Sequence, residues 1–407
     1  MKLKPTRALQ FSGLAALVVI TACSSASPQD EDSSAADVLQ ADAGSAGSSA
    51  DAEDTAPDIV DTGSDTGPGV PVNLREPQVD LESVSGIQRD KVTYVVPGLG
   101  TDRTLDVRIW YATDDEEGEA AVFALGIFFD EFAWEGASVL PPLGTERAPL
   151  VVFSHGGLGF PGQISTVARQ FVRNGWVVVA PTHPGHVLTL AETEDLPYSF
   201  PVIRAFDVIE AIDHVENLPE DHPLSGRVDT SRVLAMGHSF GGQNAWILGG
   251  LPLDLDGIKE GCGDGCTQAD IAAYEAFSPD PRVVAGVSLE SLINSNLLPD
   301  ESFAQMQTPM LHISGTEGND ATGLFARAAA ADLTWVSLIG GCHESSTGTL
   351  PCRTLELEDS LRATSVYAVS FGTRHLLGSS DPSVMNILDG SVEVSPSAVL
   401  QRSLGAP

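Results

Sequence analysis

Residues 237–242 of the chain read GHSFGG and directly follow the short apolar segment 233–236. Ser239 therefore lies in a Gly-x-Ser-x-Gly pattern between a predicted strand and a predicted helix. Glycines on either side let a strand turn sharply into a helix without a side-chain clash, and the turn lifts the serine hydroxyl above the sheet at a helix N-terminus. The stretch predicts a nucleophile elbow with Ser239 as the nucleophile. The alternative is a glycine-rich turn that only packs a helix, and the flanking strand and helix favour the elbow.

Short apolar segments on both sides of the elbow alternate with helix-like segments. Near-continuous apolar strands between helices are typical of a parallel sheet that is covered on both faces. The sequence therefore predicts an α/β fold with a mostly parallel sheet and helices on both faces. The predicted strands are 150–153, 176–180, 233–236, 283–289, 310–314 and 334–338, the predicted helices are 163–173, 203–217 and 322–332, and two antiparallel strands, 92–96 and 105–111, open the sheet.

A second glycine-rich stretch, HGGLG at residues 155–159, follows the predicted strand 150–153. An acyl-transfer site needs backbone N–H donors for the oxyanion, one from the residue after the nucleophile and one from a loop after an early strand. We expect Phe240 and Gly157 to supply them, with Gly156 as the alternative to Gly157. A simple strand-to-helix turn would explain these glycines but not their coincidence with the elbow.

The catalytic base should be a histidine downstream of Ser239 if the chain has the order serine, acid, histidine. Three histidines meet this condition. His312 falls inside a predicted strand and is expected to be a core residue, and His375 lies in a helical C-terminal stretch where we expect it to be solvated. His343 follows the last predicted strand, at the strand end where Ser239 is presented, and we expect it to be the base.

The acid that orients the base has three candidates. Glu290 ends the predicted strand 283–289, whereas Glu317 and Asp320 lie in the loop after the next strand. Parallel strands end at the same edge of the sheet, so each position can reach His343. A solvated surface carboxylate is the alternative for each of them.

These stretches resemble the α/β-hydrolase superfamily and, within it, the platelet-activating-factor acetylhydrolases and the predicted dienelactone-hydrolase-like esterases. The resemblance covers about residues 90–345 and implies an α/β-hydrolase fold with a serine nucleophile elbow. It rests on VVFSHG at 151–156, WVVVAPTHPG at 176–185, GHSFGG at 237–242, GVSLE at 286–290, RIWY at 108–111 and the pair Arg204 and Asp207.

The resemblance implies a serine hydrolase of the carboxylesterase or lipase kind, which works through a triad and an acyl-enzyme without a cofactor or a metal. In acetylhydrolases of this kind the acid position corresponds to Glu290, which we prefer to Glu317 and Asp320. The chain departs from the pattern in two places: Glu290 stands where Asp is usual, and Gly318 stands where other α/β-hydrolases carry the acid. True dienelactone hydrolases have a cysteine nucleophile, so Ser239 disfavours lactone opening.

The expected substrates are short-chain esters and lipid esters, including phospholipids that carry an acetyl group. A catalytically inactive, surface-tethered binding module and a serine peptidase of the same fold are the alternative functions. The apolar stretch 186–200 forms either a lid or acyl-pocket wall or a plain surface loop. His183 and His186 have a spacing that suits a metal, but a place at the rim of the site is the preferred interpretation.

Residues 1–22 have the pattern of an export signal. Three basic residues precede an apolar segment that is too short to cross a bilayer as a helix. Residues 20–23 read ITAC, which resembles a bacterial lipobox and implies cleavage before Cys23 and lipidation of its sulfur. An ordinary secretory signal that is cut near Ala22 is the alternative. Because Ser24 is not an aspartate, we expect a lipid-anchored protein of the outer membrane, on its periplasmic face or at the cell surface.

The chain has 407 residues and a formal net charge of −35, from 21 Lys and Arg against 56 Asp and Glu. Such an acidic surface repels phosphate backbones, which argues against nucleic-acid binding. Residues 23–72 are rich in small, polar and acidic side chains and predict a disordered tether. Residues 73–407 are the predicted catalytic domain, expected to be a monomer that meets the membrane through the lipid anchor only.

Apart from Cys23 the sequence contains four cysteines: Cys262, Cys266, Cys342 and Cys352. An even number of cysteines in an exported protein predicts two disulfides. Three connectivities are allowed, and pairing Cys262 with Cys266 and Cys342 with Cys352 closes the two shortest loops. A four-cysteine zinc site is disfavoured because these spacings match no zinc motif and the compartment is oxidising.

Overall fold

The computed structural model describes residues 79–404, without 144, 190–195, 292, 294–296 and 319–320. All of the described residues belong to one compact unit, residues 68–407. The predicted export signal 1–22, Cys23 and the tether 23–72 lie outside the described residues. Asp320 and the middle of the stretch 186–200 lie outside them as well.

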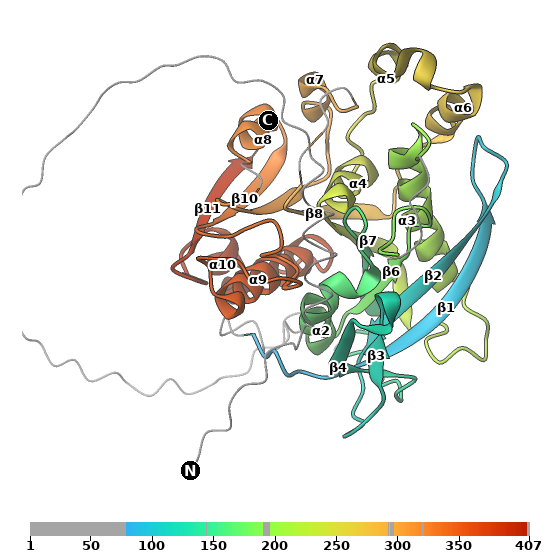
Figure 1. Cartoon of the computed structure of the whole chain (residues 1–407). Coiled ribbons are helices and arrows are strands. Elements are labelled where there is room, and N and C mark those ends of the chain that lie inside the picture. The colour runs from blue at the N-terminus through green and yellow to red at the C-terminus, as the bar shows by residue number, and fades with distance from the viewer. Residues whose placement is uncertain are drawn as a thin grey trace, which may run out of the picture. The chain divides into compact units, whose positions relative to one another are not determined.

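Within the described residues eleven strands form one sheet, in the order β11-β10-β9-β8-β7-β5-β6-β2-β1-β4-β3 (Figure 1). The six strands from β10 to β6 run parallel, whereas β11 pairs antiparallel with β10, and β2 pairs antiparallel with β6 and β1. The strands are β1 Ser85–Val95, β2 Asp102–Tyr111, β3 Ala120–Val122, β4 Phe129–Glu135, β5 Ala148–Ser154, β6 Val177–Pro181, β7 Val228–His238, β8 Val283–Leu289, β9 Met310–Gly315, β10 Asp332–Leu338 and β11 Ala398–Leu404.

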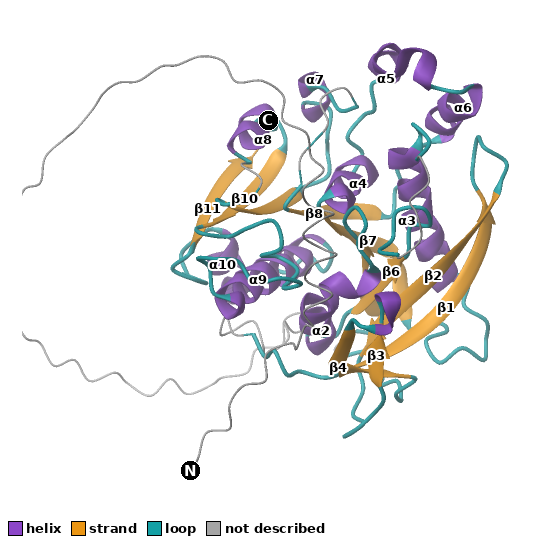
Figure 2. Ribbon diagram, viewed as in Figure 1, coloured by secondary structure: helices purple, strands orange, loops and turns teal. Residues whose placement is uncertain are grey.

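Helices cover both faces of the sheet (Figure 2). Helices α3 and α4 pack on one face, and α2, α9 and α10 form the core of the other. None of the helices in the described part of the chain is long and apolar enough to span a bilayer. The helices are α2 Ser165–Arg173, α3 Phe200–Glu216, α4 Phe240–Leu248, α5 Leu255–Cys262, α6 Gln268–Ala276, α7 Asp300–Phe303, α8 Thr322–Arg327, α9 Leu357–His375 and α10 Pro382–Leu388, with 3₁₀ turns η2 Ala124–Gly126, η3 Pro161–Ile164 and η4 Gly263–Gly265.

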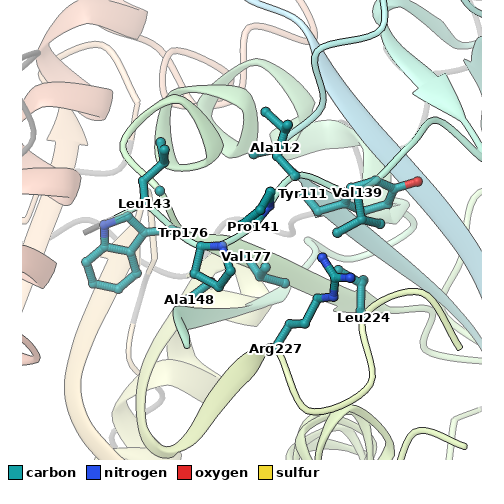
Figure 3. Close-up of a pocket in the computed structure, with 13 residues that line it drawn as sticks. Tyr111, Ala112, Val139, Pro141, Leu143, Ala148, Trp176, Val177, Leu224 and Arg227 are labelled. Atoms are coloured by element: carbon teal, nitrogen blue, oxygen red, sulfur yellow. The ribbon is translucent and has the colours of Figure 1, made fainter. Parts of the chain in front are cut away.

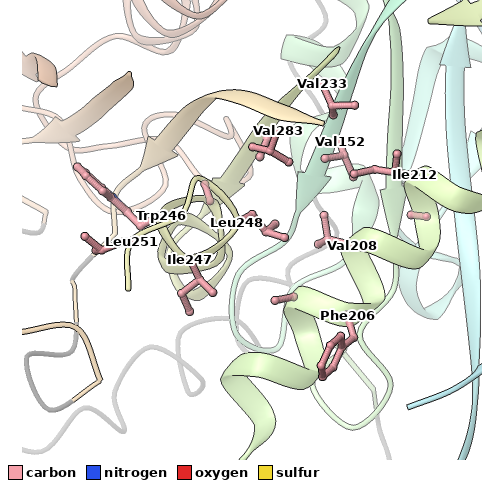
Figure 4. Close-up of a cluster of buried hydrophobic side chains, with 14 of the residues drawn as sticks. Val152, Phe206, Val208, Ile212, Val233, Trp246, Ile247, Leu248, Leu251 and Val283 are labelled. Atoms are coloured by element: carbon pink, nitrogen blue, oxygen red, sulfur yellow. The ribbon is translucent and has the colours of Figure 1, made fainter. Parts of the chain in front are cut away.

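The central strands are apolar at successive positions because both of their faces are buried. In β5, Leu150 and Val152 join the core under α3 and α4, while Val151 and Phe153 join the core under α2 and α9. Successive strand side chains point to opposite faces, so each face of the sheet receives every second residue. Figure 4 shows part of the first core, where Val152 lies near side chains of α3 and α4. Each fully buried aliphatic side chain contributes about 1.5–3 kcal/mol to folding.

Several elements differ from the sequence-based expectation. The predicted helix 322–332 ends at Arg327, because the following residues turn so that β10 can begin at Asp332. The strands β3, β4 and β11 were not anticipated by the apolar pattern. The opening strands 92–96 and 105–111 correspond to β1 and β2, which are longer than predicted and pair antiparallel as expected.

Candidate active site

Strand β7 ends at His238 and helix α4 begins at Phe240, so the turn between them consists of Ser239. Ser239 has φ of 54° and ψ of −119°, a strained backbone conformation for a residue with a side chain. Its glycine neighbours permit the turn. A Cβ on Gly237 would overlap the carbonyl group of Gly241, and a Cβ on Gly241 would overlap the carbonyl group of Ser154. The strand–turn–helix elbow predicted from GHSFGG is present.

Hydrogen bonds tie the elbow to the end of β8 and to the loop after β10. The Ser239 N–H donates to the carbonyl oxygen of Leu289 over 2.8 Å, which places Glu290 next to the elbow. His238 Nε2 donates to the carbonyl oxygen of His343, in the loop after β10, over 2.8 Å, and the two imidazole rings are 4.8 Å apart. The segments that carry the candidate nucleophile, acid and base therefore meet at the carboxyl edge of the parallel strands.

Glu290 is fully buried and has a left-handed φ of 49°. Its Oε1 accepts hydrogen bonds from the Gly315 N–H at 2.6 Å and from Ser345 Oγ at 2.8 Å. A Cβ on Gly318 would lie 2.8 Å from Glu290 Oε2 and 2.9 Å from the backbone nitrogen of His343. The carboxylate and the start of His343 thus border the same small space, which a side chain at Gly318 would fill.

The other two candidate acids differ from Glu290 in their surroundings. Glu317 is exposed, and its Oε1 accepts a hydrogen bond from Thr354 Oγ1 at 2.8 Å. Its side chain is therefore engaged at the surface. Asp320 lies outside the described residues. Between the two acids that the structure describes, burial and the link through Ser345 favour Glu290 as the partner of His343.

Burial determines the protonation state of His343. Removal from water, together with the nearby imidazole of His238, lowers the pKa of His343 from 6.5 to about 4, although Glu344 acts in the opposite direction. The imidazole is therefore neutral at pH 7, as a general base must be. The loop that carries His343 is closed by the disulfide Cys342–Cys352.

The four cysteines of the body form the two pairs with the shortest loops. Cys262 pairs with Cys266 between α5 and α6, and Cys342 pairs with Cys352 beside His343. Of the three connectivities that the sequence allows, the structure has this one.

The other two downstream histidines, His312 and His375, have surroundings that differ from those of His343. His312 is buried in β9, where its Nδ1 lies 3.2 Å from Ser288 Oγ and burial lowers its pKa to about 3. His375 is half-buried rather than solvated as expected, because its ring packs on Phe371 at 4.4 Å. Arg232, seven residues before Ser239 in the sequence, donates to the His375 carbonyl oxygen over 2.7 Å, so His375 lies toward the other end of β7.

The glycine loop after β5 lies against the elbow. A Cβ on Gly156 would be 3.4 Å from Ser239 Cβ. The Gly156 N–H donates to Gln163 Oε1 at 3.2 Å and is therefore engaged. Among the described residues, the N–H groups of Gly157 and Phe240 donate to no acceptor. This difference favours Gly157 over Gly156 as the second oxyanion donor beside Phe240.

A buried polar network supports the glycine loop after β5. Of this network, only Arg204, Asp207 and His183 were named from the sequence. Asp207 is fully buried and accepts hydrogen bonds from Arg103 Nε at 2.6 Å, Tyr94 Oη at 2.8 Å and His183 Nδ1 at 2.8 Å. With Nδ1 donating, His183 Nε2 accepts from Ser154 Oγ at 2.9 Å. Buried charges need such partners, since an unpaired ion in the interior costs several kcal/mol.

Arg204 links that network to the glycine loop. Its guanidinium is fully buried and donates to Ser154 Oγ at 3.1 Å and to the carbonyl oxygen of His155. It also lies over the ring of Phe240, 4.7 Å from the ring centre, and contacts His186 Nδ1 at 3.1 Å. Arg204 therefore touches both segments that carry the candidate oxyanion donors.

Three groups at the site could hold a metal ion. His238, His343 and Glu344 each offer a nitrogen or oxygen atom within 4.8 Å of the others. Because His238 Nε2 already donates to a carbonyl oxygen, this trio is also accounted for without an ion. The expectation that the site needs neither metal nor cofactor stays a prediction.

A small cavity lies at the opposite end of the sheet. It has a volume of about 20 Å³ and lies beside the start of β5 and β6, where Ala148, Trp176 and Val177 contribute to its wall (Figure 3). That volume admits about one water molecule. Ser239 follows the other end of the parallel strands, so this cavity is not the place where Ser239 meets a substrate.

Comparisons with known proteins identify the family and the fold class of the chain. The family model described as "Alpha/beta hydrolase family" matches residues 151–405. Among solved structures, the chain is similar to a ferulic acid esterase from Streptomyces cinnamoneus, with a TM-score of 0.56 and 18% sequence identity over 78% of this chain and 96% of that chain. At that identity the likeness is one of fold, and it confirms the predicted fold class. None of the curated proteins matches the chain.

Proposed function

The chain belongs to the alpha/beta hydrolase family, and we propose that it is a serine hydrolase of carboxylic esters, similar in its reaction to platelet-activating-factor acetylhydrolases. One observation carries the proposal. The strained turn places Ser239 directly before Phe240 and against Gly156, the neighbour of Gly157. The backbone N–H groups of Gly157 and Phe240 have no acceptor within the part of the chain that the structure describes. A nucleophile next to two unused donors is the arrangement that acyl transfer requires.

The proposed mechanism uses side chains of this chain only. His343 takes the proton of Ser239 while the hydroxyl oxygen attacks the ester carbonyl carbon, and Glu290 stabilises the resulting imidazolium. The N–H groups of Gly157 and Phe240 donate to the negative oxygen of the tetrahedral intermediate. The alcohol leaves with the proton from His343. Water that is activated by His343 then hydrolyses the acyl-enzyme and restores Ser239.

The side chains near the proposed oxyanion hole are aromatic, which supports an apolar acyl group. The rings of His186 and Phe240 are 5.2 Å apart and edge-on, and Phe200 lies 5.3 Å from His186. Such a wall can bury the methyl and methylene groups of an acyl chain. We infer short-chain esters and acetylated phospholipids as the substrate class.

A substrate panel tests the proposed function. Purified protein would be assayed with p-nitrophenyl esters from acetyl to palmitoyl, a phospholipid with an acetyl group, a ferulate ester and a peptide p-nitroanilide. We expect the acetyl and butyryl esters and the acetylated phospholipid to be hydrolysed fastest. Cleavage of the anilide without the esters would indicate a peptidase, and a folded protein that is inert toward all of them would indicate a binding module.

The pH dependence of the reaction should reflect the buried base. Hydrolysis requires neutral His343, so kcat/KM is complete above the pKa of this group and falls as the pH drops through about 4. An imidazole in water would place the acid limb near its ordinary value of 6.5. The measurement is a profile of kcat/KM from about pH 3 to pH 8, with circular dichroism at each pH to exclude unfolding. An acid limb at or above 6.5 in the folded protein would contradict this assignment.

We further propose that the protein is exported and is held at the outer membrane by lipid on Cys23, as a monomer that binds no nucleic acid. The export and the lipid anchor rest on the ITAC sequence at residues 20–23, and the exclusion of nucleic acid rests on the formal net charge of −35. Cys23→Ala should release the protein from the membrane fraction or block its maturation, which fractionation and immunoblotting would reveal. Ser239→Ala serves as the control that leaves the anchor intact. A Cys23→Ala variant that partitions with membranes like the wild type would refute the lipid anchor.

A further inference from the structure

A histidine outside the proposed triad contacts both segments of the proposed oxyanion hole. This histidine is His186, which lies in the segment after β6. His186 Nε2 is 3.0 Å from the position that a Cβ on Gly157 would occupy, and the imidazole ring is 5.2 Å from the Phe240 ring. Gly157 and Phe240 are the two residues whose N–H groups are assigned to the oxyanion. The ring therefore lies beside both of the residues that are assigned to the oxyanion hole.

The position of the proton on His186 follows from its contact with Arg204. A guanidinium group has only hydrogen-bond donors, and Arg204 Nη1 lies 3.1 Å from His186 Nδ1. Nδ1 must therefore accept this hydrogen bond, and the proton of the neutral ring is on Nε2. Burial and the positive charge of Arg204 lower the pKa of His186 to about 4, so the ring is neutral at pH 7.

Arg204 is held rigidly enough to fix this arrangement. Its side chain is fully buried and also donates to Ser154 Oγ and the His155 carbonyl oxygen. Burial lowers the pKa of Arg204 to about 9, which leaves it a cation at neutral pH. One guanidinium thus positions both the glycine loop and the His186 imidazole. Among the residues with described positions, His186 Nε2 has no hydrogen-bond acceptor.

We propose that the Nε2–H group of His186 is a third hydrogen-bond donor to the oxyanion, with Arg204 as its positioning residue. The inference rests on the proposed esterase function and extends it. His186 neither gains nor loses a proton, and no covalent bond forms to it. Because the donor is oriented before the reaction, it stabilises the developing negative charge without a cost of reorganisation.

Three substitutions at one position separate a donor from a packing residue. His186→Gln places an amide nitrogen at the position of Nε2 and retains a donor. His186→Asn ends at the position of Nδ1, so it can still accept from Arg204 but offers nothing at Nε2. His186→Phe preserves a ring between Phe200 and Phe240 without any donor. Thermal unfolding of each variant shows whether the fold is retained.

We expect His186→Asn and His186→Phe to lower kcat for p-nitrophenyl butyrate at least about tenfold, with KM within about threefold of the wild type. His186→Gln should recover most of that loss. A boronic acid that forms a tetrahedral adduct with Ser239 should bind the two donor-free variants more weakly by a similar factor. A folded donor-free variant with wild-type kcat, or equal losses in all three variants, would overturn the inference.

The proposed function and this inference can fail separately. Wild-type ester turnover in Ser239→Ala would refute the serine esterase itself. An inactive Ser239→Ala together with fully active His186→Asn and His186→Phe would refute only the role of His186.

Discussion

Replacement of Ser239 by alanine is expected to abolish ester hydrolysis, with a loss in kcat on the order of 10⁶-fold, because the removed hydroxyl is the group that attacks the substrate. The fold should persist. Alanine is smaller than serine, and the φ of 54° at this turn is no more strained for alanine than for serine. The measurement is kcat for p-nitrophenyl butyrate with purified wild type and variant, together with the thermal unfolding midpoint of each protein.

Ser231→Ala is a matched control for this experiment. Ser231 is an exposed residue of the same strand, β7, and its Oγ is hydrogen-bonded to Asp229 at 2.6 Å. We expect this control to retain wild-type kcat within about twofold, as surface substitutions usually do. Turnover by folded Ser239→Ala above about one per cent of the wild type would mean that another group attacks the ester.

The second large effect is expected at the acid. Glu290→Gln should lower kcat by about 10⁴-fold, since an amide in place of a triad carboxylate leaves the shape intact but no longer stabilises the imidazolium. The amide oxygen can still accept from the Gly315 N–H and Ser345 Oγ, as Glu290 Oε1 does. The variant is therefore expected to remain folded, which thermal unfolding would verify before the kinetics are interpreted.

Two further substitutions test the choice of the acid. Glu317→Gln should have wild-type kcat within about twofold, because Glu317 is exposed and bonded to Thr354. Asp320→Asn should also stay close to the wild type. An inactive Asp320→Asn beside an active Glu290→Gln would instead indicate the common α/β-hydrolase layout, with the acid after β9. The relationship to acetylhydrolases would then be weaker than we propose.

The central part of the fold was predictable because burial on both faces leaves a simple pattern. A strand such as 283–289 is apolar except for Ser288, and β8 has the same bounds. Strands near the sheet edges leave a weaker signal. In β11, exposed positions such as Val399 alternate with partly buried ones, and β3 has three residues. Such segments are recognised only once their neighbours in the sheet are known.

The candidate site was predictable to the extent that it depends on local sequence. The elbow requires glycines around Ser239, and strand ends bring Glu290 and His343 to one edge of the sheet. The network around Asp207 depends on residues that are remote in sequence, since Tyr94 is 113 positions away. Each of these residues is unremarkable by itself. The sequence suggested a rim position for His186, but its proton donor is defined only by the contact with Arg204.

The most direct test of the central claim is covalent labelling of the nucleophile. Folded wild-type protein would be treated with a fluorophosphonate probe, digested and analysed by mass spectrometry. The proposed function predicts about one phosphonate per chain, attached to Ser239, and no label in Ser239→Ala. No label on the folded wild type, or a label on a different residue, would contradict the assignment of Ser239 as the nucleophile of a serine hydrolase.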